Sequence, residues 1–96
     1  MIEIRETERY VRWYESLRDR NARIRIDVRV GRLALGNLGD VKSVGSGISE
    51  LRIDYGPGYR IYFTRRGEQL ILLINGGSKS SQRDDIAIAK EIAAKL

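Results

Sequence analysis

Two kinds of spacing between apolar residues divide this chain into segments. From residue 50 to residue 64, apolar and polar side chains alternate, which is the period-2 pattern of half-buried strands. The alternation is broken at Gly56-Pro57-Gly58, where proline fixes φ and glycine allows positive φ, so we expect a sharp reversal. After a turn at Gly67, residues 70–74 are continuously apolar, as in a strand covered on both faces. The pattern predicts an antiparallel meander of three strands.

A helical spacing appears near the N-terminus, after a short alternating stretch at residues 1–5 that suits an edge strand. Thr7 is a suitable N-cap, with the acidic Glu8 beside the positive end of the helix. The apolar residues that follow share one helical face, and we interpret this face as packing against the sheet rather than stacking on bases. They are Tyr10, Trp13, Tyr14 and Leu17.

Residues 22–35 fit two patterns. Ile24, Ile26, Val28 and Val30 alternate with polar residues, and β-branched side chains favour a strand. The same segment also fits a helix, because its apolar residues recur at helical intervals. The members of that helical stripe are Ala22, Ile26, Val30 and Leu33.

The remaining segments are a loop and a final helix. Residues 36–49 hold four glycines, with a short extended piece expected at 41–44. Ser81, with Asp84 three residues later, resembles a capping box at the start of a C-terminal helix, and we interpret Asp84 and Asp85 as helix-start residues rather than a metal pair. The apolar stripe of that helix is Ile86, Ala89, Ala93 and Leu96.

Length and composition narrow the function. Ninety-six residues are one domain, residues 1–96, and no segment suits a signal peptide or a membrane span, so we expect a cytoplasmic protein. Without cysteine or histidine, the chain lacks disulfides and the commonest metal ligand, and we expect no metal and no cofactor. The net charge is +5, and 14 of the 18 basic residues are arginine, whose planar fork matches phosphate. Nucleic acid is therefore the favoured partner, although an acidic protein would also fit.

Three strings together resemble the RelE/ParE toxin superfamily, in particular its HigB-like branch of phage-derived addiction module killer proteins. They are L-x-L-G-N-L-G-D-V-K-S-V-G-x-G-I-x-E-L-R-I, then G-P-G-Y-R-I-Y-F, then N-G-G-S-K-S-S-Q-x-x-D-I, and the resemblance covers roughly residues 20 to 95. It implies an α+β fold in which an N-terminal helical hairpin packs on a small, mostly antiparallel sheet, followed by a short C-terminal helix. Residues 22–35 are then the second helix of the hairpin.

Strand alternation indicates which polar residues share a face. Arg60 and Tyr62 point away from Tyr59, Ile61 and Phe63, and across an antiparallel ladder Arg52 joins them on the face that we expect to be free of helices. Lys79 follows the last strand, past a Gly76-Gly77 pair that we interpret as flexible. This cluster suits RNA cleavage without a metal ion, by attack of a 2′-hydroxyl on its own phosphate.

Each residue of the cluster has an expected role. Arg60 stabilises charge on the phosphate, and Lys79 holds the phosphate or protonates the leaving 5′-oxygen. Tyr62 orients the 2′-hydroxyl or acts as the base, if neighbouring cations lower its pKa. Further candidates for RNA binding are Arg52, Lys42, Arg65 and Arg83.

The resemblance implies a toxin of a type II toxin–antitoxin module that cleaves mRNA on the ribosome and so inhibits translation. Its expected partners are the ribosome, mRNA and a cognate antitoxin, usually a helix-turn-helix protein, in a hetero-oligomer that binds operator DNA. Two alternatives stay open. One is a ParE-like toxin that poisons DNA gyrase, and the other is a non-catalytic remnant that binds its antitoxin and co-represses the operon.

Overall fold

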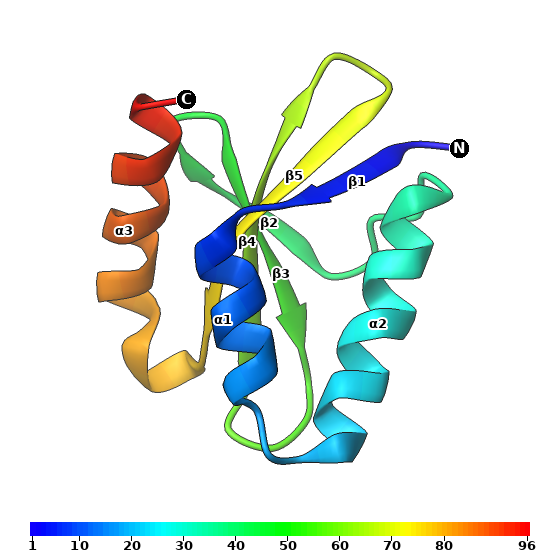
Figure 1. Cartoon of the computed structure of the whole chain (residues 1–96), viewed down its shortest axis with the longest axis vertical. Helices are drawn as coiled ribbons and strands as arrows, with labels where there is room; N and C mark the ends of the chain where they lie inside the picture. Colours follow the sequence, from blue (N-terminus) through cyan, green and yellow to red (C-terminus); the bar gives the residue numbers. More distant parts are fainter.

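The computed structural model describes all residues 1–96 as one α+β unit built on a five-stranded sheet (Figure 1). The strand order is β1-β5-β4-β3-β2, with β1 parallel to β5 and all other neighbours antiparallel. The expected meander is confirmed as β3, β4 and β5. In chain order the elements are β1 (Glu3–Glu6), α1 (Glu8–Ser16), α2 (Arg20–Ala34), β2 (Val41–Gly45), β3 (Ile48–Ile53), β4 (Tyr59–Arg66), β5 (Leu70–Gly77), the 3₁₀ turn η1 (Lys79–Ser81) and α3 (Gln82–Ala94).

The N-terminal helical hairpin forms as the resemblance implied. The Thr7 hydroxyl accepts the backbone N–H of Tyr10 at 3.1 Å and so caps α1. Asp19 caps α2 by accepting the N–H groups of Asn21 and Ala22. The ambiguous segment is therefore helical. Three members of its helical stripe, Ala22, Ile26 and Leu33, are buried, while Ile24 and Val28 of the competing strand pattern are 51% and 48% exposed. Packing of one stripe against the sheet outweighs the strand propensity of the β-branched residues.

Helices cover both faces of the sheet. In Figure 1, α1 lies in front of the strands, α2 lies to their right, and α3 lies at the left, separate from the hairpin. The face under α1 and α2 carries the larger core, and the other face carries a smaller core that includes Tyr62 and Ala89 of α3. The expectation that the Arg60 face is free of helices is therefore wrong, because α3 packs on β4 and β5. The larger core consists of Tyr10, Ile26, Leu33, Leu51, Ile53, Ile61, Phe63, Ile71 and Leu73.

One extra residue in β5 changes the phase of that strand. Tyr62 pairs with Asn75 and the next residue, Phe63, pairs with Leu73, so Ile74 is the additional residue of a β-bulge. Ile74 belongs to the smaller core, and Asn75 donates from its amide to the carbonyl of Asp85 on α3 at 3.0 Å. Ile74 and Asn75 thus both face α3. After them, successive residues of β5 again alternate between the two faces of the sheet, shifted by one residue.

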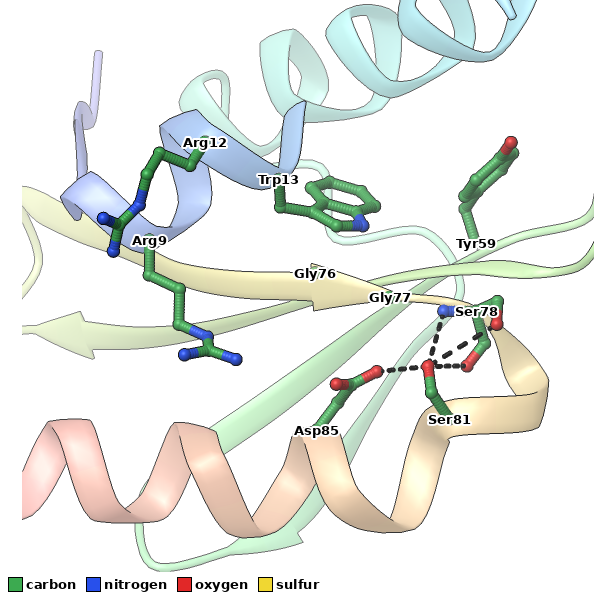
Figure 2. Close-up of a pocket in the computed structure, with 9 residues that line it drawn as sticks. All are labelled: Arg9, Arg12, Trp13, Tyr59, Gly76, Gly77, Ser78, Ser81 and Asp85. Carbon is green, nitrogen blue, oxygen red and sulfur yellow. Dashed lines mark hydrogen bonds between the residues drawn. The ribbon is translucent and has the colours of Figure 1, made fainter. Parts of the chain in front are cut away.

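The Gly76-Gly77 pair ends β5 and is closely covered, so its interpretation as a flexible joint is wrong. A Cβ on Gly76 would lie 2.4 Å from the indole ring of Trp13, and a Cβ on Gly77 would lie 1.8 Å from a carboxylate oxygen of Asp85. Figure 2 shows the two side chains on opposite sides of the strand. Glycine is needed here because two side chains rest directly on the backbone.

The start of α3 differs in detail from the capping box expected at Ser81. Its hydroxyl makes no cap for α3 and instead donates to the carboxylate of Asp85 at 2.5 Å. The same oxygen accepts the N–H of Ser78 at 3.2 Å, which closes the 3₁₀ turn. Asp84 and Asp85 do lie in the first turn of the helix, where acidic side chains are favourable. None of the helices is long and apolar enough to cross a membrane.

Candidate functional site

The pairing of β3 with β4 builds a polar cluster on the face under α3. Glu50 lies opposite Tyr62 in the ladder, and Arg52 lies opposite Arg60. The Glu50 side chain is completely buried and its two carboxylate oxygens are divided among its neighbours. Tyr62 and Gln82 donate to Oε2 at 3.0 and 2.7 Å, while Arg52 donates from Nε to Oε1 at 3.1 Å. Glu50 therefore joins two strands and α3 through a single carboxylate.

Glu50 is an anion in this environment. Burial acts to raise its pKa, but hydrogen bonds from Gln82, Arg52 and Tyr62, together with the positive charge of Arg60, hold the pKa below its ordinary value. The Nε of Arg60 lies 4.0 Å from Oε1, within reach of the negative charge but without a hydrogen-bond partner. The carboxylate thus holds Arg52 through a hydrogen bond and attracts Arg60 through charge alone.

Tyr62 is not available as a base. Its side chain is completely buried and its hydroxyl donates to Glu50. Burial, followed by the negative charge of Glu50, raises the pKa of the Tyr62 hydroxyl well above its ordinary value. The predicted lowering of this pKa is therefore wrong, since the nearest charge is the anion that Tyr62 holds in place. Tyr62 is a positioning residue for Glu50.

The cations gather above this cluster in a groove of about 450 Å³, which we call the cationic groove. Arg52, Arg60 and Lys79 line it together with the exposed carboxylates of Asp40 and Asp54. Lys79 reaches it because its backbone N–H donates to the carbonyl of Pro57 at 3.3 Å, which ties η1 to the β3–β4 loop. The strand pairing and this tie bring together residues 27 positions apart in sequence, from Arg52 to Lys79.

The other residues predicted to bind RNA are dispersed. Lys42 is exposed on β2, opposite Glu50 in the ladder, and is one strand away from Arg52. Arg83 is exposed in the first turn of α3. Arg65 lies toward the far end of β4, where its guanidinium donates to the carbonyls of Gly67 and Glu68 in its own turn. The structure therefore places Arg52 in the groove and Arg65 outside it.

Comparison with known proteins identifies a relative and a fold. No protein-family model matches the chain. An uncharacterized protein of Haemophilus influenzae is 44% identical over 95 residues, which are 99% of this chain and 96% of that protein. The chain belongs to the same family.

The fold itself is RelE-like. A chain of the intact Escherichia coli RelBE toxin–antitoxin complex matches with a TM-score of 0.67 and 17% sequence identity, over 81% of this chain and 96% of that chain. In this RelE-like fold the cationic groove lies where the β3–β4 loop meets η1. The match establishes the architecture, and the roles of individual residues rest on the geometry described above.

Two contributors to the site were missed in the sequence. Gln82 reads as an ordinary polar residue at a helix start, and only folding brings it to Glu50, which lies 32 residues earlier. Glu50 was not assigned to the site either, although it pairs with Arg52 and is completely buried. Its burial could have been predicted from the strand face that it shares with Tyr62. In a domain with three helices, the third helix is free to pack on that face.

Proposed function

We propose that this chain is the toxin of a type II toxin–antitoxin module in the RelE/ParE superfamily, of the HigB-like branch, and that it cleaves mRNA in the ribosomal decoding site without a metal ion. The observation that carries the proposal is the cationic groove, in which three cations surround a space open to a phosphate while a buried anion forms ion pairs with two of them. The RelE-like fold supports it, because the solved neighbour is part of a toxin–antitoxin complex.

The groove suits in-line transesterification of RNA. The 2′-oxygen bonds to the adjacent phosphorus, the P–O5′ bond breaks, and the products carry a 2′,3′-cyclic phosphate and a 5′-hydroxyl. Arg60 stabilises the charge that develops on the phosphate oxygens, and Arg52 orients the phosphate beside it. Lys79 donates a proton to the leaving 5′-oxygen. Asp40 and Asp54 line the same groove and can accept the proton of the 2′-hydroxyl.

This assignment makes the isolated chain a weak catalyst. Positioning and electrostatic stabilisation supply most of the effect, and no tyrosine or histidine base is at hand, since Tyr62 is buried and the chain has no histidine. Alignment of the 2′-hydroxyl with the P–O5′ bond then depends on the ribosome, which holds the mRNA in a defined conformation. An antitoxin, by our proposal a helix-turn-helix protein that also binds operator DNA, keeps the toxin inactive.

Induced expression in growing cells tests the proposal. We expect growth arrest together with new mRNA 5′ ends inside reading frames. Arg60→Ala should lower the cleavage rate by about 10²–10³ because it removes one preorganised donor to the transition state. The matched control is Arg66→Ala, which removes an exposed arginine from the other end of β4 and should leave cleavage unchanged.

Two outcomes would contradict the proposal. Intact mRNA with linearised plasmid DNA from trapped gyrase would assign the chain to the ParE-like alternative. Normal growth, with binding of the antitoxin retained, would assign it to the non-catalytic alternative. Thermal unfolding of purified Arg60→Ala must match that of the wild type, so that loss of cleavage is not loss of fold.

A further inference from the structure

A second recess lies beside the cationic groove, along the edge of β5. Strand β1 pairs with β5 only from Leu70 to Leu73, and Thr7 then turns the chain into α1. Beyond this point the edge of β5 has no strand beside it, and α1 and α3 flank it on either side (Figure 2). The resulting recess, which we call the edge cleft, measures about 600 Å³ and is the larger of the two.

The side chains of the edge cleft have the chemistry of a phosphodiester site. Arg9 and Arg12 project from α1 along one wall, Trp13 and Tyr59 supply aromatic edges, and Ser78 supplies a hydroxyl opposite. The hydroxyl of Ser81 also lines the cleft but donates to Asp85. Arginine forks and hydroxyl groups are the usual donors to nucleic-acid phosphate and sugar. The two glycines of β5 form the floor, so the backbone itself borders the space.

The edge cleft holds more positive than negative charge. Arg9 takes part in no ion pair, and Arg12 has only a 3.5 Å pair with the exposed Glu8. The one carboxylate in the cleft, Asp85, accepts the hydroxyl of Ser81 and lies against Gly77. With two arginines against one carboxylate, the cleft keeps a net positive charge, and Arg9 has no ion-pair partner within the chain.

The edge cleft and the cationic groove share a wall that is one residue thick. Tyr59 lines the edge cleft and the next residue, Arg60, lines the groove. In the same way Ser78 lines the cleft and Lys79 lines the groove. Tyr59 and Arg60 are consecutive residues of β4 and so point to opposite faces, whereas Ser78 and Lys79 lie past the end of β5. A chain of nucleotides that runs from the cleft to the groove at this point meets cations in both.

We propose that the edge cleft binds a phosphate that flanks the scissile phosphate on the same single-stranded RNA. Arg9 and Arg12 hold this neighbouring phosphate, while Arg52, Arg60 and Lys79 hold the scissile one. The proposal rests on the proposed function and adds the path of the substrate. It also gives α1 a part in RNA binding that is separate from the packing of Trp13 on the sheet.

A length series of RNA oligonucleotides tests this path. The probes are fluorescein-labelled single strands of two to eight nucleotides, each with one 2′-deoxy nucleotide that prevents cleavage there, and affinity is measured by fluorescence anisotropy at several salt concentrations. For the wild type we expect affinity to rise as nucleotides are added on one side of a minimal probe. The double variant Arg9→Ala/Arg12→Ala should lose this gain, with about tenfold weaker binding to the longer probes.

The salt dependence gives an independent reading. Each phosphate contact contributes about 0.7 to the slope of log affinity against log salt for single strands, so losing one flanking contact should reduce the slope by about 0.7. The matched control is Arg32→Ala/Arg66→Ala, which removes the same charge from exposed positions on α2 and the far end of β4. It should retain the gain with length.

The possible failures can be told apart. If Arg60→Ala weakens binding but Arg9→Ala/Arg12→Ala matches the control, the edge cleft is not part of the RNA path and the proposed function stands. If neither variant differs from the wild type, or wild-type affinity does not rise with length, the RNA path through the edge cleft is overturned, whereas the proposed function is decided by the mRNA 5′ ends in cells. If the double variant keeps its RNA affinity but no longer binds a polyglutamate peptide that the wild type binds, the cleft serves an acidic protein and the RNA path is overturned.

Discussion

The two faces of the sheet are held together in different ways. Under α1 and α2 the contacts are apolar, and nine buried hydrophobic residues form one cluster. Under α3 the smaller cluster is joined by the buried polar residues Glu50, Thr64 and Asn75, together with Tyr62. Thr64 donates to the carbonyl of Gly47 and Asn75 donates to that of Asp85. The face under α1 and α2 is stabilised by apolar packing. On the face under α3, hydrogen bonds also fix the orientation of the polar side chains beneath the cationic groove.

The difference matters because the two kinds of contact fail differently. Apolar packing loses free energy roughly in proportion to the area and volume removed. A buried polar group is stable only with its partner, and removing one partner leaves the other unsatisfied. The α3 face should therefore be the more sensitive to single substitutions that conserve volume.

The largest expected effect comes from Glu50. Glu50→Ala removes the carboxylate beneath two arginines and leaves Tyr62 and Gln82 without an acceptor, so the free energy of unfolding should fall by about 3–5 kcal/mol. Leu51→Ala, at the adjacent residue on the opposite face, should cost about 2–5 kcal/mol through a cavity. Urea unfolding of both variants measures these losses.

The two variants should differ in how the loss can be repaired. Leu51→Met, which keeps most of the volume, should recover most of the stability, whereas Glu50→Met should not. Equal recovery at both positions would show that the α3 face is held by volume alone.

Tyr62→Phe isolates one hydrogen bond on the polar face. The ring stays in place while the charged acceptor loses a donor, so we expect a loss of about 1.5–3 kcal/mol in unfolding free energy. RNA cleavage by the folded variant should stay within a few-fold of the wild type, because the hydroxyl is buried beneath the cationic groove. If the variant unfolds like the wild type but its cleavage rate falls by orders of magnitude, Tyr62 takes part in the reaction itself.

The glycine pair offers the same comparison at adjacent residues. Gly76→Ala forces the added methyl into the indole of Trp13, and Gly77→Ala forces it into the carboxylate of Asp85, so each should cost about 1–3 kcal/mol. Trp13→Leu should relieve the first clash only, and Asp85→Ala should relieve the second only. Double-mutant cycles by thermal unfolding measure this coupling, and cross-relief between the pairs would contradict the placement of the two side chains.

The smallest effect is a dependence on pH that only one face should show. Because the pKa of Glu50 is held below its ordinary value of 4.5, its ionised form stabilises the fold fully above that value. The contribution disappears as pH falls through the lower pKa of the folded state. The difference in unfolding free energy between wild type and Glu50→Gln should shrink in acid, whereas that between wild type and Leu51→Ala should stay constant. Urea titrations from pH 7 to pH 3 compare the two differences.

The apolar face and the meander were predictable from sequence, and much of the polar face was not. Periodicity places Leu51 and Ile61 on one side and Thr7 at a helix start, because these signals are local. Residues 22–35 needed the family resemblance, since both periods fit them. The contact between Glu50 and Gln82 has no local pattern, because it depends on where α3 returns to the sheet.

The bulge and the glycine pair were unpredictable for a related reason. A continuous apolar run gives no indication of which residue is the extra one, so the phase of β5 after Ile74 could not be assigned from its sequence. Two consecutive glycines suggest freedom of the backbone when no neighbours are visible. Because they have no side chain, the glycines leave room for Trp13 and Asp85 to contact the backbone. These two residues come from helices that precede and follow the strand, so the contact is not visible in the local sequence.

The parallel pairing of β1 with β5 has a consequence for synthesis of the chain. Residues 3–6 leave the ribosome well before residues 70–73, which are their only strand partner. Closing so long a loop is slow compared with forming the hairpins between β3, β4 and β5. Until β5 emerges, the first strand has no place in a sheet and Trp13 has no glycine to cover. The domain therefore stays incomplete until β5 has left the ribosome, and its fold, with the groove and the edge cleft, forms only after that point.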